Sequence, residues 1–183
     1  MGKLLSTSDL RRDTVIDSAI RVFARTGYLG TPIAAVAQHA KISPAYVFKL
    51  FPSKEGLFVA ALERAFARIR STLAEGADRS ADAAPELVLA AMGAAYATLI
   101  AERDLLMLQV HALSVADIPE IGASFRAGLQ LTVDFVHSRS GASHEAVQRF
   151  FAYGQLCHLI ATLSLDGEQG GWTRTLTAGM HHP

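Results

Sequence analysis

This 183-residue sequence has a single cysteine and lacks long apolar runs. Its one cysteine, Cys157, has no second thiol for an internal disulfide, which is typical of proteins from reducing compartments. No stretch approaches the roughly 18 uninterrupted apolar residues of a membrane helix. The first residues also lack the order of basic, apolar and small residues that marks a secretion signal. These absences predict a soluble, cytoplasmic protein that does not bind a membrane.

The motifs of common enzyme sites are absent as well. The sequence contains no HExxH metal motif, no glycine-rich phosphate loop and no nucleophile elbow. Seven histidines are present, but the helix–loop–helix pattern between His137 and His144 separates them too far for a ligand pair. The adjacent Cys157 and His158 point in different directions on a helix. We therefore expect no catalytic residue, no metal site and no cofactor.

The composition favours a folded protein with an uneven distribution of charge. Half of the residues are apolar, which disfavours disorder, and the formal net charge is zero. Residues 1–56 contain eight Lys and Arg against four Asp and Glu, a charge of +4, whereas residues 57–183 contain nine against thirteen, a charge of −4. A basic segment on an acidic body is typical of a phosphate-binding module joined to a non-binding domain. Ordinary variation of surface charge gives the same asymmetry.

Helical periodicity runs through the sequence, and no alternating strand pattern or internal repeat interrupts it. The segment 76–83 is small and polar and is expected to form a loop. Asp117 and Glu120 have the spacing of a capping box, and the glycine-rich tail after Leu165 has no clear pattern. The predicted helices cover residues 8–26, 32–40, 44–50, 53–74, 85–101, 104–115, 117–139 and 143–165.

Residues 31–58 contain three marked helix starts within a short span. Thr31 and Ser43 each precede a proline, which suits the first position of a helix, and Ser53 follows Pro52. We expect each hydroxyl to cap the helix that follows it. Three helices that start so close together must cross at short range.

The helix over 44–50 has a small, aromatic and basic outer face. Val47 and Leu50 lie on its inner side, whereas Ala45, Tyr46 and Lys49 point outward. Two short helices joined by three residues form a helix-turn-helix, in which the second helix enters the DNA major groove. The pattern alone is equally compatible with a small helical bundle that does not bind DNA.

The string AKISPAYVFKLFPSKEGLF resembles the end of the DNA-binding domain of the tetracycline-repressor (TetR) family of bacterial regulators. The similarity extends upstream through TVIDSAIRVFARTGY, which resembles the opening helix of that domain, and it covers roughly the first third of the chain. The resemblance implies an all-α fold. An N-terminal three-helix DNA-binding helix-turn-helix domain, residues 1–56, would be joined by a long helix to a C-terminal bundle, residues 57–183, for effector binding and dimerisation.

The resemblance further implies binding of double-stranded operator DNA. Lys54 and Thr31 stand at helix starts, where backbone N–H groups favour phosphate, and Lys49 suits a phosphate or a guanine edge. Ala45 and Tyr46 are expected to contact base edges. The predicted DNA-binding residues are Thr31, Ser43, Pro44, Ala45, Tyr46, Phe48, Lys49 and Lys54.

Two positions depart from the family pattern. The turn of the family carries glycine where this chain has Lys41, so a left-handed backbone there would cost about 1–2 kcal/mol, unless the turn differs. The phosphate-touching tyrosine of the family aligns with Phe48, which has no hydroxyl. We expect Phe48 to pack, with Tyr46 or Lys49 taking over the contact.

The last two long helices favour self-association. The helix over 143–165 has almost no polar side, so it is either central to one subunit or buried on two faces. The resemblance implies a homodimer in which the segments 121–138 and 144–163 form a four-helix contact with their two-fold copies. Core packing within one subunit is the alternative.

A mixture of soft apolar and polar side chains in the C-terminal part is typical of a small-molecule pocket, and equally of a core. The candidate ligand-binding residues are Met92, Tyr96, Met107, Val110, His111, Ser114, Phe125 and Gln155. We therefore predict a repressor that a small, largely apolar effector releases from its operator. The rival interpretation is a helical protein-interaction module, which would lack salt-dependent binding to duplex DNA.

Overall fold

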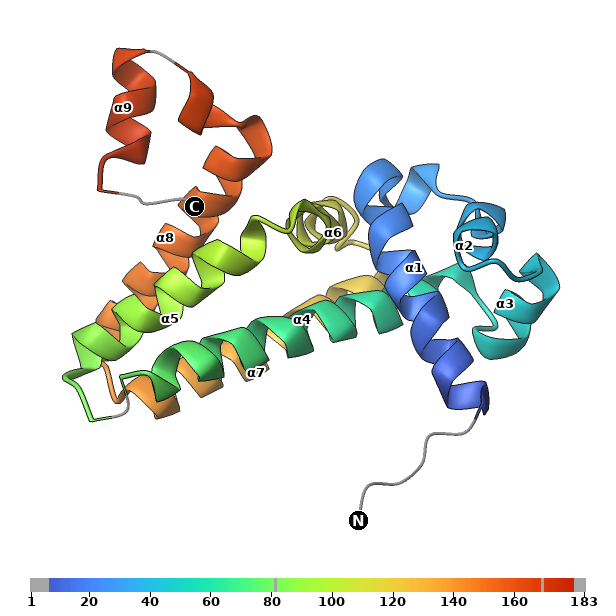
Figure 1. The fold of residues 1–183 in the computed structure, drawn as a ribbon, viewed down its shortest axis with the longest axis horizontal. Helices are drawn as coiled ribbons and strands as arrows, with labels where there is room; N and C mark the ends of the chain where they lie inside the picture. The colour runs from blue at the N-terminus through green and yellow to red at the C-terminus, as the bar shows by residue number, and fades with distance from the viewer. Residues whose placement is uncertain (1–6, 81, 169, 180–183) are drawn as a thin grey trace. The chain divides into compact units, whose positions relative to one another are not determined.

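The computed structural model describes residues 7–80, 82–168 and 170–179, and the regular secondary structure in these ranges is entirely helical (Figure 1). The predicted all-α fold is thereby confirmed. No single helix in these ranges is long and apolar enough to cross a membrane, and only α5 and α6 together, bent by 94° at their junction, reach the necessary length and composition. The elements are α1 (Thr7–Gly30), α2 (Ile33–His39), α3 (Pro44–Leu50), α4 (Lys54–Asp78), α5 (Pro85–Ile100), α6 (Arg103–Leu113), α7 (Pro119–Ser140), α8 (His144–Leu163), the short 3-10 helix η1 (Leu165–Gly167) and α9 (Gly171–Thr177).

The chain forms two compact units, and neither is continuous in sequence. Unit 1 comprises Met1–Ala65 and Met107–Ala127, and unit 2 comprises Phe66–Leu106 and Gly128–Pro183. Helices α4, α6 and α7 each contribute residues to both units. Unit 1 therefore contains the predicted helix-turn-helix together with a later segment that we had assigned to the C-terminal bundle. The functional division at residue 56 stays a prediction.

The predicted apolar face of α4 is buried. Each fully buried aliphatic side chain of this size contributes roughly 1.5–3 kcal/mol relative to an exposed one. This face explains why α4 remains a single helix through 25 residues. Its members, spaced by about one turn, are Leu57, Ala61, Ala65, Ile69 and Leu73.

Helix α4 ends later than the sequence pattern indicated. The segment 76–83 was expected to be a loop, but α4 continues through Gly76 to Asp78. A Cβ atom built on Gly76 would lie 2.8 Å from the Ala91 carbonyl oxygen and 2.9 Å from Met92 Cα. The glycine therefore marks a close crossing of α4 and α5 within unit 2, and not a helix end.

The other helix boundaries follow the caps only in part. Ser143 Oγ accepts the N–H of Ala146 at 3.2 Å and caps α8 as predicted. Helix α7 begins at Pro119, so Asp117 does not occupy the position that the predicted capping box requires. The short helix α9 was not predicted, because glycines surround it and its start has no side-chain cap.

We predict that Gly76→Ala destabilises the protein. Alanine normally stabilises a helix interior relative to glycine by roughly 0.5–1 kcal/mol, but here the added methyl group meets backbone atoms, which should cost about 1–3 kcal/mol. The measurement is the free energy of unfolding in urea. The matched control is Gly93→Ala inside α5, where a built Cβ has one neighbour, Phe150 Cε2 at 3.7 Å. Equal or greater stability of Gly76→Ala would contradict the proposed close crossing.

Candidate nucleic-acid interface

A cluster of three aromatic rings joins the end of α1 to the start of α4. Phe23 and Phe58 are fully buried, with ring centroids 4.9 Å apart in an edge-to-face arrangement, and Tyr28 lies 5.3 Å from Phe58 in the same manner. Gly27 has φ 70° and interrupts the helical conformation of α1 immediately before Tyr28. The break turns Tyr28 onto Phe58, so the first and fourth helices of unit 1 are packed directly together.

The hydroxyl of Tyr28 binds the first turn of α4. It donates to Glu55 Oε1 at 2.5 Å. Burial raises the pKa of Tyr28 to about 12, with further contributions from the hydrogen bond and charge of Glu55, and the same hydrogen bond lowers the pKa of Glu55. Lys54 Nζ lies 4.6 Å from the Tyr28 ring centroid and donates to the Leu29 carbonyl at 3.4 Å. The ammonium group is thereby held at the start of α4.

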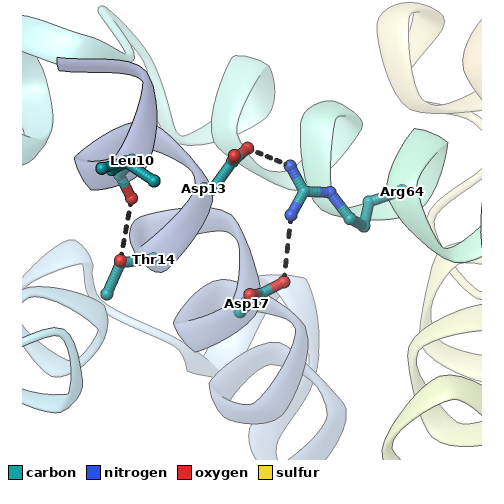
Figure 2. Close-up of polar contacts among 5 residues, drawn as sticks. All are labelled: Leu10, Asp13, Thr14, Asp17 and Arg64. Atoms are coloured by element: carbon teal, nitrogen blue, oxygen red, sulfur yellow. Dashed lines mark hydrogen bonds and ion pairs between the residues drawn. The ribbon is translucent and has the colours of Figure 1, made fainter. Parts of the chain in front are cut away.

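Arg64 forms a second tie between α4 and α1. Figure 2 shows its guanidinium between Asp13 and Asp17; one nitrogen donates to Asp13, and Nη1 donates to Asp17 Oδ1 at 3.2 Å. The two carboxylates share one face of α1 because they are four residues apart. All three side chains are partly exposed, so these ion pairs contribute little net stability. Their role is to orient α1 along α4.

The turn between α2 and α3 is a Schellman motif. The N–H of Ile42 donates to Ala37 O at 3.0 Å and that of Lys41 donates to Gln38 O at 3.1 Å, which are the two bonds that define this helix end. Lys41 has φ 56°. The left-handed backbone considered at this position is therefore confirmed, and a non-glycine residue occupies it.

Helix α3 has the predicted cap and the predicted faces. Ser43 Oγ accepts the N–H of Tyr46 at 3.2 Å, and Pro44 is the first helical residue. Val47 is fully buried, whereas Ala45 and Lys49 are exposed and Tyr46 is half-buried. The helix is anchored on one side and presents a different set of side chains on the other.

Two arginines of α1 lie beside α3, and neither was predicted to belong to this site. The Arg11 guanidinium is 5.5 Å from the centroid of the Tyr46 ring, and Lys49 Nζ is 6.0 Å from it. Arg12 donates to the Leu50 carbonyl at 2.8 Å and lies 4.1 Å from the Phe51 ring centroid. A basic pair on the first helix was visible in the sequence, but nothing local indicated that it would reach α3.

Two predicted DNA-binding residues differ from expectation. Thr31 is 1% exposed, and its hydroxyl donates to Gly27 O at 2.7 Å and also contacts Thr26 Oγ1. Pro32, and not Thr31, is the N-cap of α2, and no side chain caps that helix. The predicted cap by Thr31 is therefore incorrect, whereas the phosphate contact at this helix start stays a prediction. Phe48, expected to pack, is 48% exposed because it lies on the outer side of α3.

The candidate ligand-binding residues are divided between the units. Met107, Val110, His111, Ser114 and Phe125 belong to unit 1, and Met92, Tyr96 and Gln155 belong to unit 2. The His111 ring packs on the helix break of α1, with Nδ1 3.0 Å from a Cβ built on Gly27. Met92 is fully buried, as the core alternative requires, and Gln155 is exposed.

Two further features of unit 2 were not predicted. The rings of His137 and His144 are stacked, with centroids 4.5 Å apart and planes 5° from parallel, so the argument that they are too far apart is wrong. Parallel rings nevertheless do not aim two nitrogens at one ion. An open groove of about 530 Å³ lies along α4 and α5, and Arg68 and Glu102 form an ion pair of 2.9 Å in its wall. The groove is lined by Arg68, Ser71, Thr72, Glu75, Arg79, Ala95, Thr98, Leu99 and Glu102.

The helix-turn-helix region matches a known family. Residues 15–61 match the model of bacterial regulatory proteins of the tetR family. Over 66 residues the chain is 32% identical to the HTH-type transcriptional repressor NicS of Pseudomonas putida, covering 36% of this chain and 31% of NicS. Over 71 residues it is 35% identical to the HTH-type transcriptional repressor KstR of Mycolicibacterium smegmatis, covering 36% of this chain and 35% of KstR. The matched region thus spans about a third of these relatives.

The similarity of fold extends over most of the chain. A TetR-like transcriptional regulator from Rhodococcus sp. RHA1 superposes with a TM-score of 0.66 at 20% sequence identity, covering 94% of this chain and 93% of that structure. At such low identity the superposition demonstrates the shared fold. It does not carry over the function of individual residues.

Lys41→Gly is expected to stabilise the protein by about 1 kcal/mol, because glycine adopts the left-handed conformation at φ 56° without the Cβ clash. Urea denaturation gives the change in the free energy of unfolding. Lys41→Ala is the matched control, since it removes the same charge and keeps the strain, and its stability should stay near that of the parent. If both variants were equally stable, charge and not backbone conformation would account for the effect.

Proposed function

Because residues 15–61 match the model of the tetR family of bacterial regulatory proteins, we propose that this chain is a cytoplasmic, DNA-binding transcriptional repressor of that family that a small, largely apolar effector releases from its operator. The observation that supports this most directly is the outer side of α3. Its exposed Ala45, Phe48 and Lys49 surround Tyr46, and Arg11 joins them from α1. A short capped helix with such a face suits the major groove.

In the proposed complex, apolar and charged side chains have separate roles. Ala45 and Phe48 offer apolar contact to a thymine methyl group, and the Tyr46 hydroxyl offers a hydrogen bond to a base edge. Lys49 and Arg11 bind phosphate or a guanine edge. Lys54, at the first position of α4, binds backbone phosphate through its ammonium group.

A homodimer would present two copies of α3 to a palindromic site. Helix α8 carries an apolar stripe on which Leu159 and Leu163 are 46% and 57% exposed, with Tyr153 beside it at 60%. Leu131 of α7 is 55% exposed. Exposed large apolar side chains on these two helices support the predicted contact between 121–138 and 144–163 and their two-fold copies.

The proposed response to the effector is a matter of linkage. An effector can lower operator affinity only by the factor by which it prefers the conformation that does not bind DNA. Helix α6 contacts the helix-turn-helix region, since His111 packs against the Gly27 break at the end of α1. A displacement of α6 would therefore change the packing of α1 against α4.

Selection from a pool of randomised DNA duplexes tests the central proposal. The expected result is an enriched inverted repeat whose half-sites lie roughly one helical turn, about 34–36 Å, or a multiple of it apart. The rival helical interaction module predicts no enrichment and no salt-dependent duplex binding. That result would overturn the proposed function.

We predict that Lys49→Ala weakens binding to the selected duplex and makes the dependence of affinity on salt shallower by about one unit in the log–log slope, if its contact is with phosphate. Fluorescence anisotropy over a series of salt concentrations measures both quantities. Arg174→Ala on α9 removes an exposed positive charge outside the helix-turn-helix and serves as the control. Lys54→Ala should behave as Lys49→Ala does. Unchanged slopes in both variants would exclude these lysines from the phosphate contacts.

Leu159→Glu is predicted to convert the dimer to monomers, because a buried, unpaired carboxylate in an apolar interface is strongly unfavourable. Sedimentation velocity measures the mass. The matched control is Leu87→Glu on α5, which is 60% exposed and lies outside the proposed interface. A Leu159→Glu variant that remains dimeric would place the interface elsewhere.

A further inference from the structure

A buried polar pair lies between α5 and α8, which run side by side in unit 2 (Figure 1). His158 of α8 is 6% exposed, and its Nε2 forms a short hydrogen bond with the hydroxyl of the half-buried Tyr96 of α5. The ring centroids are 5.9 Å apart. His158 is therefore held at one nitrogen within an otherwise apolar contact.

The other nitrogen of His158 has no hydrogen-bond partner in the part of the chain that the structure describes. Burial lowers the pKa of His158 to about 4, so the imidazole is neutral near pH 7 and carries one proton. Because a phenol is a better donor than acceptor, we infer that the Tyr96 hydroxyl donates to Nε2 and that the imidazole proton lies on Nδ1. Nδ1 is buried and has no hydrogen-bond partner among the described residues. A buried donor in this state costs roughly 1–3 kcal/mol.

A second unpaired polar atom lies one turn further along α8. Thr162 Oγ1 is buried and also lacks a partner within the described part of the chain. Other helical threonines of this protein donate to the carbonyl four residues earlier, as Thr98 does to Ala94 and Thr132 to Gly128. Thr162 does not make this bond. Because His158 and Thr162 are four residues apart, both orphan groups lie on the same side of α8.

Glycines leave room beside this pair. A Cβ built on Gly154 of α8 would meet a single atom within 4 Å, Tyr96 Cε1 at 3.9 Å, and one built on Gly93 of α5 would meet only Phe150 Cε2 at 3.7 Å. Both glycines are half-buried. By comparison, the crossing of α4 and α5 at Gly76 leaves no room for a Cβ atom.

We propose that this seam of α5 and α8 is a ligand site for an uncharged, largely apolar molecule with one carbonyl oxygen. One carbonyl oxygen has two lone pairs and accepts both from His158 Nδ1–H and from the Thr162 hydroxyl. Tyr96 and Phe150 provide aromatic walls. Arg103, the cation at this end of α8, already donates to the carbonyls of Ala161 and Thr162, at 3.0 and 3.2 Å. Arg103 is therefore poorly placed to compensate the negative charge of a carboxylate at the seam.

The identification of this ligand as the effector rests on the proposed function, whereas the binding site itself does not. Occupation of the seam would satisfy two buried groups that are unpaired in the free protein. The ligand would therefore bind more tightly to a conformation in which both groups donate to its carbonyl oxygen than to one in which they do not.

The direct test compares three probes of equal carbon number, methyl hexyl ketone, octane and octanoate, by NMR titration of the full-length protein. The ketone should bind at least about tenfold more tightly than the alkane, since one net hydrogen bond and the relief of an unpaired donor together exceed the 1.4 kcal/mol that a factor of ten represents. The imidazole nitrogen spectrum should show the Nδ1–H tautomer. Equal affinity for ketone and octane, tightest binding of octanoate, or no saturable binding of any probe would overturn the proposal.

Variants separate the hydrogen bonds from general apolar binding. Thr162→Val keeps the shape and removes one donor, and His158→Phe removes the other; each should reduce the preference for ketone over octane and leave octane affinity nearly unchanged. Gln148→Ala, at an exposed position of the same helix, should preserve the preference. An intact preference in both donor variants would refute the assigned contacts.

A separate measurement distinguishes failure of this site from failure of the proposed function. Affinity for the selected duplex is measured without any probe and again at a saturating ketone concentration. Loss of duplex binding by the unliganded protein would refute the proposed function while the probe titration still decides the site. Ketone binding that leaves duplex affinity unchanged would support the site and contradict its regulatory role.

Discussion

The packing of Phe58 against Phe23 and Tyr28 is the constraint on which the position of the helix-turn-helix, α2 and α3, depends. All three residues are buried, and the edge-to-face contacts of about 5 Å combine apolar burial with favourable ring geometry. Phe58 belongs to the first turns of α4, so the cluster fixes where that helix starts relative to α1. Helices α2 and α3 are too short to be stable alone and take their positions from this frame. The hydrogen bond from Tyr28 to Glu55 and the ion pairs of Arg64 further fix the orientation of α4 relative to α1.

The sequence was informative wherever structure depends on neighbouring residues. Ser43 and Ser143 cap their helices because a hydroxyl before a helix start needs only the next turn. The buried face of α4 follows from spacing alone. A left-handed backbone at Lys41 was considered because the resembled family carries glycine at this place in the turn, and the structure has φ 56° there. These features are local, and the helix-turn-helix is built almost entirely from them.

The errors arise where another part of the chain, near or distant in sequence, competes with the expected contact. Gly76 looked like a helix end, but α5 packs against it and needs the missing side chain. Thr31 has the sequence of a cap, yet the break at Gly27 places a free carbonyl within reach of its hydroxyl. Phe48 faces outward because Val47 and Phe51 already fill the inner side of α3. For the same reason Arg11 and His158 had no recognisable signal, since their partners Tyr46 and Tyr96 lie on other helices.

The proposed regulation by a ligand would involve helices that contribute residues to both units. Helices α4, α6 and α7 each do so. Helix α6 ends beside Gly27, where the backbone of α1 leaves the helical conformation. The same break positions Tyr28 on Phe58 and on the first turn of α4. In the proposed function, a shift at this point would act on the packing that holds the start of α4, and thereby on the proposed affinity of α3 for DNA.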